Sequence, residues 1–346
     1  MTSDKVKDQR PSKIVEIDAL HAPEDVIREL ARHLLLLRQE RNPEYPLLPV
    51  EEVIKELRHP PEETMKVRNW AIYSGECMVA RAMAMINLIE RENPSLFSYI
   101  SVLPYYRRRG LATRLLEALK ECARQYGKSI LVIDSTDRFP SGKEFLSHIG
   151  AEEGLVGHVN RLDLQDLDQE RMRQWIERSG ERVKGFRLLF FEGMPPDHLM
   201  DSYCQMLSHI METQPSGSIT FPFKLATPEM VRELFKMDEC AGRRFWSLVG
   251  IEDTTGRIAG YTELFFHPKT TQLITQGGTC VFTEFRNRGI GRWLKATLVL
   301  KLVHEVPEAR WIITGNADVN APMLKINHEM GFRPCEATAF WQYHLQ

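Results

Sequence analysis

The sequence has 346 residues, of which 43% are hydrophobic and 27% are charged, and its formal net charge is −2. This length is about twice that of a usual domain of ~100–200 residues, so two domains are the first expectation. The balanced charge excludes the broad electrostatic footprint of a protein that binds nucleic acid or an anionic membrane. Small molecules are therefore the favoured partners.

The N-terminal region and the cysteines indicate the cellular compartment in which the protein works. The sequence lacks an apolar signal region, and no run approaches the ~18 apolar residues of a membrane span. Residues 1–12 are mostly polar, and disorder is expected only there. The six cysteines form no C-x-x-C pair and have no histidine at metal spacing, so we interpret them as reduced thiols and expect no metal site. These features predict a cytoplasmic location.

The elements of the first half follow from its apolar periodicity. Leucines and isoleucines at helical spacing after Pro23, and a second amphipathic run, indicate two helices before a group of strands. Glycine and Asn-Pro-Ser turns separate the strands into an antiparallel meander. Helices are predicted at 27–37, 50–57 and 110–126. Strands are predicted at 68–74, 78–88, 97–102 and 129–134.

The second half repeats this order of elements. Helices are predicted at 228–237, at 290–304 and from 321 onward. Strands are predicted at 245–251, 258–266, 273–282 and 311–314, with a last strand pair closing the chain. A polar helix at 169–178 and an apolar strand at 186–191 lie between the copies. We therefore predict an N-terminal domain over 1–165 and a C-terminal domain over 166–346.

One sequence pattern occurs once in each half. The tract V-L-P-Y-Y-R-R-R-G-L-A begins at Val102, and V-F-T-E-F-R-N-R-G-I-G begins at Val281. The offset between Gly110 and Gly289 is 179 residues, and flanking glycines keep nearly the same offset. A repeat in the same structural context indicates that both halves share one fold.

In each tract a strand runs into the motif R-x-x-G-x-[GA], and a helix starts inside the motif. Such a junction aims free backbone N–H groups and the positive end of the helix dipole at one point, which suits a pyrophosphate. A small residue lets the phosphates approach the backbone, and the arginines can reach phosphate oxygens. For one copy alone, the alternative interpretation is a plain strand-to-helix connection with solvated arginines.

The meander, the V-x-P-x-Y-R-x-R-G-x-A tract, the helix, the strand and a closing Gly-Phe together resemble the acetyl-CoA-binding region of GNAT N-acetyltransferases. The resemblance covers roughly 65–165 and 245–345. The second half is also similar to tandem GNAT proteins of the mycothiol-synthase type, in G-Y-T-E at 260–263, T-G-N at 314–316 and N-A-P-M at 320–323. The resemblance implies an α/β (α+β) chain of two tandem GNAT folds. Each would have a mixed, mostly antiparallel sheet, flanked by helices, with a splayed central strand pair.

The resemblance also implies acetyl-CoA as the cofactor, with up to one molecule in each domain. Strand backbone next to the motif would bind pantetheine, and Asn320 stands where an asparagine commonly contacts it, although Asn320 is equally a good N-cap. The predicted cofactor-binding residues are Val102, Arg107, Arg108, Arg109, Gly110, Leu111, Ala112 and Thr113 in the first half and Cys280, Val281, Phe282, Arg286, Asn287, Arg288, Gly289, Ile290, Gly291, Arg292 and Asn320 in the second.

The catalytic candidates lie in the second half. A strand carboxylate can remove the proton of an attacking amine, and Glu263 is the first candidate; an exposed strand carboxylate is the alternative. GNAT enzymes often carry a tyrosine four residues before the closing glycine, where this chain has Leu146 and Asn327. Because asparagine can only hydrogen-bond the sulfur, the acid is Tyr261, Tyr343 or water.

The first half has the phosphate motif but lacks the leaving-group tyrosine and shows no obvious strand carboxylate. We therefore expect the C-terminal domain to be catalytic, and the N-terminal domain to bind CoA with little or no turnover. The resemblance implies transfer of an acetyl group to a primary amine of a small molecule by direct attack in a ternary complex. The alternatives are another acyl-CoA, a protein amine, or a CoA-binding sensor or scaffold without turnover. The chain is expected to be a monomer or a homodimer.

Overall fold

The computed structural model describes residues 13–346, so the disorder expected at 1–12 lies outside the described residues. Within this range the strands form one continuous sheet in the order β1-β2-β3-β4-β5-β12-β6-β11-β10-β9-β8-β7. The strands are β1 (Val15–Ile17), β2 (Met65–Ser74), β3 (Cys77–Asn87), β4 (Ser95–Val102), β5 (Ile130–Thr136), β6 (Glu152–Asp163), β7 (Phe186–Glu192), β8 (Arg244–Glu252), β9 (Ile258–Phe266), β10 (Leu273–Val281), β11 (Trp311–Ala317) and β12 (Arg333–His344).

Helices cover both faces of this sheet. They are α1 (Glu24–Arg41), α2 (Val50–Leu57), α3 (Leu111–Gln125), α4 (Pro140–His148), α5 (Gln169–Ser179), α6 (Met200–Thr213), α7 (Pro228–Cys240), α8 (Ile290–Glu305) and α9 (Ala321–Met330). Each helix and strand predicted up to 321 is present within a few residues, and 50–57 and 258–266 are matched at both ends. The prediction of a closing strand pair is wrong: the chain ends in the single long strand β12.

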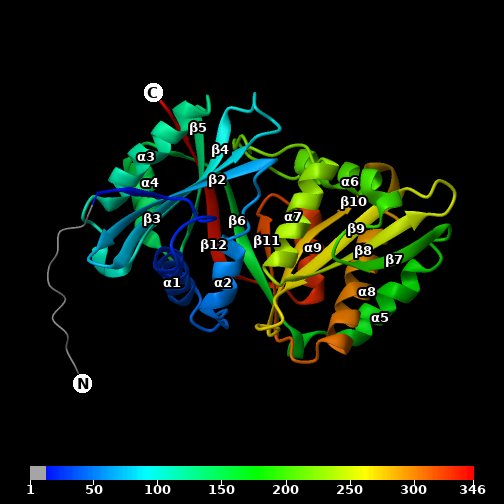
Figure 1. Ribbon diagram of the computed structural model, residues 1–346. Coiled ribbons are helices and arrows are strands. Elements are labelled where there is room, and N and C mark those ends of the chain that lie inside the picture. Colours follow the sequence, from blue (N-terminus) through cyan, green and yellow to red (C-terminus); the bar gives the residue numbers. More distant parts are fainter. Residues whose placement is uncertain (1–12) are drawn as a thin grey trace, which may run out of the picture.

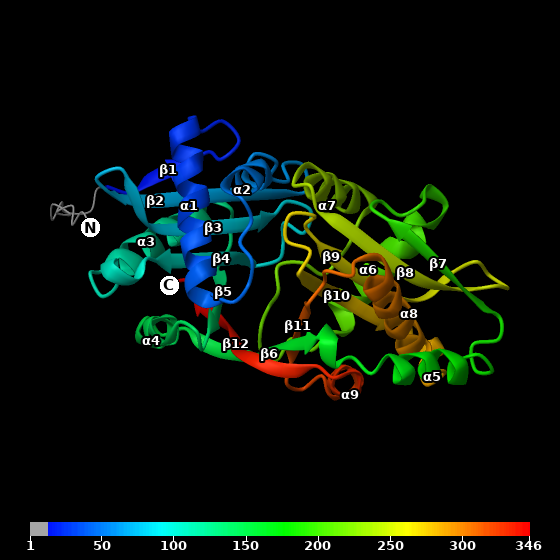
Figure 2. The ribbon, with the colours of Figure 1, turned by 90° about the horizontal axis from the view of Figure 1, so that it is seen from below.

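Alternation along the strands explains how the helices are divided between the faces. On β2, Trp70 and Ile72 belong to the cluster that packs on α3, whereas Ala71 belongs to the cluster that packs on α1. Because successive side chains of a strand point to opposite faces, α1 and α3 lie on opposite sides of the sheet. In Figure 2, α1 crosses the strands β2, β3 and β4.

The same division holds in the second half. Trp246 and Leu248 of β8 pack in the cluster with α8, and Val249 and Ile251 pack in the cluster with α6. The two halves therefore have the same layering, with α6 in the place of α1 and α8 in the place of α3.

Each half contains a pair of parallel strands that separate. The pairing of β4 with β5 ends at Ser98 and Ile133, although β4 continues to Val102. The pairing of β10 with β11 ends at Thr275 and Ile313, although β10 continues to Val281. The strand ends beyond these points open a V in the sheet, as expected from the sequence.

The halves exchange strands at the centre of the sheet. The C-terminal strand β12 pairs with β5, and β6 of the first half pairs with β11. Because β12 and β6 also pair with each other, the sheet is unbroken. Figure 1 shows β12, in red, running within the first half of the molecule. The two V openings are therefore separated by only two strands, each supplied by the opposite half.

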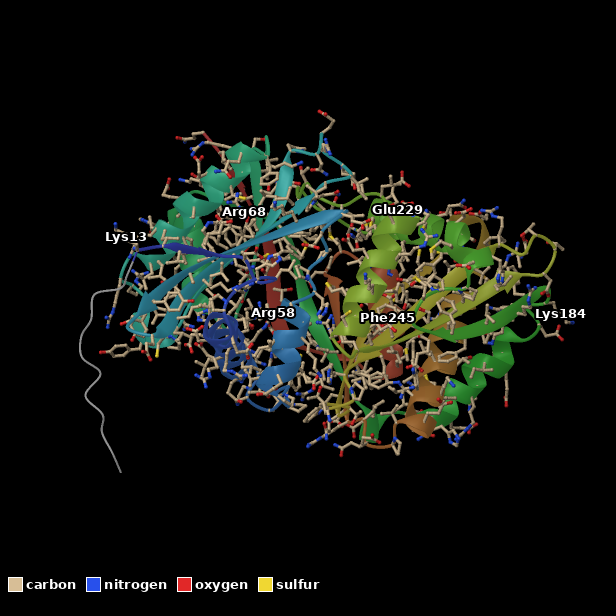
Figure 3. All side chains as sticks on the ribbon, in the orientation of Figure 1. Lys13, Arg58, Arg68, Lys184, Glu229 and Phe245 are labelled. Carbon is tan, nitrogen blue, oxygen red and sulfur yellow. The ribbon has the colours of Figure 1, made fainter. Side chains whose placement is uncertain are left out.

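Polar contacts also join the halves. Glu233 of α7 accepts hydrogen bonds from the backbone N–H groups of Glu63 and Thr64, at 2.7 and 3.0 Å. Arg243 lies 2.5 Å from Glu56 of α2. In Figure 3, Arg58 marks the end of α2, and Glu229 marks the start of α7. None of the helices in residues 13–346 is both long and apolar enough to span a membrane.

Candidate functional site

The two sequence tracts form loops of the same conformation. A 3-10 turn (Pro104–Tyr106 or Thr283–Phe285) follows the strand in each half. The second residue of the R-x-x-G motif then has a positive φ, +63° at Arg108 and +65° at Asn287. The motif glycine is left-handed as well, with φ +74° at Gly110 and +87° at Gly289. This shared backbone shows that the sequence repeat is a structural repeat.

These glycines begin the helices α3 and α8, and no side chain caps the first backbone N–H groups there. A Cβ atom added at Gly110 would have no atom within 4 Å. The space in front of the helix is therefore open, and the uncapped N–H groups point toward it. This arrangement fits an anionic group such as a phosphate.

The arginines of the loops already have partners in the protein. The Nε atoms of Arg107 and Arg286 donate to the carbonyl oxygens that end β4 and β10, at 3.0 and 3.1 Å. Arg107 also reaches Glu40 at 2.7 Å, and Arg292 reaches Glu329 at 2.8 Å. These side chains hold the loop onto its strand and onto neighbouring helices. Arg108 forms only a solvent-exposed ion pair with Glu144 at 3.3 Å, and with 79% of its side chain exposed it is more available to a ligand.

A cavity of about 570 Å³ occupies the V of the first half. It runs from the loop and the start of α3 into the gap between β4 and β5, and α4 forms one wall. Seven of the eight predicted first-half cofactor residues line it: Val102, Arg107, Arg108, Gly110, Leu111, Ala112 and Thr113. The eighth, Arg109, instead lies over the rings of Tyr105 and Tyr106.

Asp134 lies on β5 one residue beyond the last parallel pair, at the point where the V opens. Asp134 is thus a strand carboxylate in the first half, so the expectation that this half has none is wrong. The Asp134 side chain is exposed to the cavity. Because the surrounding protein displaces solvent around it, the pKa of the carboxyl is raised above its ordinary value, and the charge of Arg41 opposes this shift. Burial and the Asp134 charge also raise the pKa of Tyr99.

Arg41, at the end of α1, is held in place from the other half of the chain. Its Nε donates to Glu336 of β12 at 2.7 Å, and the Glu336 side chain is only 3% exposed. Glu336 also accepts a hydrogen bond from Thr136 of β5. The exchanged strand thus completes the polar part of the first-half site.

In the second half, Glu263 and Tyr261 lie side by side beneath β10. The Glu263 carboxylate accepts the backbone N–H of Gly278 at 2.8 Å. Burial raises its pKa to about 7, while the hydrogen bonds from Gly278 and Tyr261 act in the opposite direction. A Cβ atom at Gly277 would lie 2.2 Å from Glu263, so only glycine allows this close approach. Glu263 is therefore a partly buried carboxylate, not the exposed one of the alternative interpretation.

The other second-half candidates have structural partners. The side chain of Asn320 caps α9 by accepting the N–H of Met323 at 3.4 Å, as the N-cap interpretation predicts. Asn327 is buried and donates to Asn316 at 2.8 Å. Tyr261 is 2% exposed, and Cys280 packs with the α6 cluster. Whether any of them contacts a ligand stays a prediction.

The groups that could not be predicted from the sequence are those whose position depends on tertiary structure. Asp134, Tyr99, Arg41 and Glu336 come from four different elements. Only Asp134 had a local signal in the sequence, because it is a carboxylate at the end of a strongly apolar strand. Carboxylates are rare in such buried strands, and those that occur there are often functional.

Comparison with known proteins agrees with this description. Residues 32–141 match the model of the acetyltransferase (GNAT) family. A tandem GNAT protein from the clavulanic acid biosynthesis pathway superposes with a TM-score of 0.76 at 21% identity, covering 97% of this chain and 98% of that one. A GCN5-related N-acetyltransferase from Sphaerobacter thermophilus gives 0.61 at 15% identity, covering 96% and 95%.

A glucosamine N-acetyltransferase region of a fungal multi-domain β-N-acetylglucosaminidase gives a TM-score of 0.64 at 14% identity, with 96% of this chain and 38% of that chain covered. A comparison with curated proteins found no match. The fold is therefore that of a tandem GNAT protein. Its segment 32–141 carries the pattern of the GNAT acetyltransferases, which supports acyl transfer as the general chemistry.

Proposed function

We propose that the chain is an N-acetyltransferase that uses acetyl-CoA, and that the first half carries the reacting site. The observation behind this proposal is the first-half cavity. It begins at the phosphate loop and passes through the V to Asp134. One continuous space therefore joins a phosphate-binding geometry to a carboxylate that can act as a base.

The residues that line this space suit the cofactor. The uncapped N–H groups at the start of α3 and the exposed Arg108 would hold the pyrophosphate. The unpaired strand edge beyond Ser98 would hydrogen-bond the pantetheine arm. When bound, acetyl-CoA supplies a thioester whose carbonyl carbon accepts a nucleophile.

The side chains of the site divide the proton transfers between them. An amine with a pKa near ~10 is protonated at neutral pH, so Asp134 accepts its proton before the nitrogen can form a bond to the carbonyl carbon. As the C–N bond forms, the nitrogen releases its second proton to water. The C–S bond then breaks, and the sulfur requires a proton. The raised pKa of Tyr99 keeps its hydroxyl protonated, so Tyr99 can donate that proton.

Replacing Asp134 with asparagine tests this assignment. We expect a loss of about 100-fold in kcat/KM for the amine, the low end of what general base catalysis contributes. The activity of the unmodified protein should rise with pH as Asp134 loses its proton, with an inflection above 3.8 because the pKa of this carboxyl is raised. The variant should lose that inflection.

The release of CoA, followed with a thiol reagent between pH 4 and 9, measures both effects. Asp137→Asn is a matched control, because Asp137 is exposed and lies three residues further along the chain. Equal kcat/KM values and equal pH profiles for Asp134→Asn and the unmodified protein would remove Asp134 from the reaction.

Glu263 supports a second candidate site in the C-terminal half, where the sequence analysis placed catalysis. A carboxyl with a pKa of about 7 is well matched to accept a proton near neutral pH. If this site carries the reaction, Glu263→Gln should lower kcat by about 100-fold, whereas the first-half proposal expects a change of less than about threefold. The same CoA-release assay distinguishes the two sites.

A further inference from the structure

A second cavity, also of about 570 Å³, lies between the two halves. It covers β12 and β6, the strands that the halves exchange, and it reaches β5 on one side and β11 on the other. Arg41 and Asp134 line this cavity as well as the first-half cavity. The two spaces therefore meet at the carboxylate where the V opens.

The wall nearest Asp134 is aromatic. Phe97 of β4 stacks on Phe223 with ring centroids 5.9 Å apart, and Phe340 of β12 meets Phe221 edge-on at 5.2 Å. Leu155 of β6 adds to this apolar surface. Such a wall gives a ligand contact area without hydrogen bonds, so it favours an apolar body over a polyhydroxylated one.

Two of these rings come from a segment of the second half that is fixed onto the first. In residues 214–226, the N–H of Thr220 donates to Gln342 at 2.7 Å, and Gln342 donates back to the carbonyl of Ser218 at 2.7 Å. Asn87 donates to the carbonyl of Pro222 at 2.9 Å, and Asn93 to that of Phe221 at 2.9 Å. Hydrogen bonds from β12 and from the first half therefore fix this segment, so Phe221 and Phe223 are positioned before a ligand binds.

The charges of this cavity limit the number of cationic groups that a ligand can carry. Among residues 13–346 the Asp134 carboxyl group forms no ion pair, whereas the nearby Arg41 is paired with Glu336. One ammonium group is therefore favoured beside Asp134, and a second one would face phenyl rings. The far end is polar, since Asn316 and Asn320 line it. Three strand spacings separate β5 from β11, which is about 14 Å.

We infer that the acceptor is a monoamine carried on an aromatic or other apolar body, bound between the halves with its amine at Asp134. This inference rests on the proposed function for the site, and it narrows the substrate class. Polyamines and amino sugars are expected to be poorer acceptors, because the aromatic wall beside Asp134 offers no hydrogen-bond partner to their additional ammonium or hydroxyl groups.

A panel of three amines tests this inference with the full-length protein. 2-Phenylethylamine should show a kcat/KM for CoA release at least about tenfold above those of spermidine and glucosamine. Phe223→Ala should raise KM for 2-phenylethylamine about tenfold with little change in kcat, and Phe223→Leu should retain most of the affinity. Phe245→Ala is the control, because Phe245 is a half-buried, stacked ring in the second half (Figure 3) and does not line the cavity.

Calorimetric titration of the CoA-saturated protein with the same amines separates this inference from the proposed function. If 2-phenylethylamine binds, and binds about tenfold more weakly to Phe223→Ala, the inference stands even when no CoA is released, and only the proposed turnover fails. If spermidine or glucosamine binds or reacts as well as 2-phenylethylamine, or if Phe223→Ala behaves like Phe245→Ala, the inference is overturned.

Discussion

Replacing Gly110 with tryptophan is expected to lower CoA release from acetyl-CoA by at least about 1,000-fold, whereas Gly289→Trp should leave most of it. An indole at Gly110 would project into the open space before α3, where no protein atom lies within 4 Å of an added Cβ. It would therefore occupy the place of the phosphates and cover the uncapped N–H groups.

The backbone of Gly110 makes a control necessary. Its φ of +74° costs a non-glycine residue about 1–2 kcal/mol, so destabilisation has to be separated from a direct effect on binding. Gly127, at the end of the same helix, has φ +64° and likewise no atom within 4 Å of an added Cβ. Gly127→Trp therefore carries a similar strain without blocking the loop.

We expect Gly127→Trp and Gly110→Trp to have similar melting temperatures, and only Gly110→Trp to lose CoA binding and turnover. The opposite pattern, with turnover lost only in Gly289→Trp, would assign the reaction to the second half and to Glu263. If both loops bind CoA and no amine promotes its release, the chain is a CoA-binding module without turnover.

The repeated elements could be predicted from sequence because their signals are local. Helix periodicity, turn glycines and the R-x-x-G-x-[GA] motif each depend on neighbours in the chain, and both loops have the conformation that the motif suggests. The V also follows from the family resemblance. The missed elements, β1, α4, α6 and β6, have weak local signals, such as the three-residue length of β1 and the partly polar sequence of β6.

The exchange of β6 and β12 could not be predicted in this way. A strand pattern shows which face is buried but does not name the partner strand. Glu336 reads as an ordinary strand carboxylate, and its role follows only from the contact with Arg41, which lies 295 residues earlier in the chain. The cavity between the halves depends on the same long-range contacts, so the acceptor class was left open by the sequence.

Replacing Lys295 with methionine is expected to stabilise the protein near neutral pH. Lys295 lies in α8 and is 2% exposed, and among residues 13–346 no hydrogen bond or ion pair holds it; its ammonium lies 5.5 Å from the ring of Phe332. The equivalent position of α3, six residues after the motif glycine, is the buried Leu116. Methionine keeps the length of the side chain without a charge.

Burial lowers the pKa of Lys295 from 10.5 to about 7. Between these pH values the unfolded chain binds a proton that the folded chain does not, so the free energy of unfolding rises with pH across this window. At pH 7 and below, nearly the whole cost of burying the lysine opposes folding. A shift of this size corresponds to roughly 3–5 kcal/mol at pH 7.

Urea denaturation at pH 7, 8 and 9 measures this effect. The free energy of unfolding of Lys295→Met should exceed that of the unmodified protein by about 3 kcal/mol at pH 7. The difference should shrink steadily as the pH rises, because the folded lysine is neutral and the cost of removing the proton from the unfolded lysine falls as the pH approaches 10.5. Lys301→Met is the matched control on the same helix: Lys301 is paired with Glu305, so its replacement should produce no gain that fades with pH. If the free energy of unfolding gained by Lys295→Met is the same from pH 7 to 9, the gain comes from packing and not from removal of the buried charge.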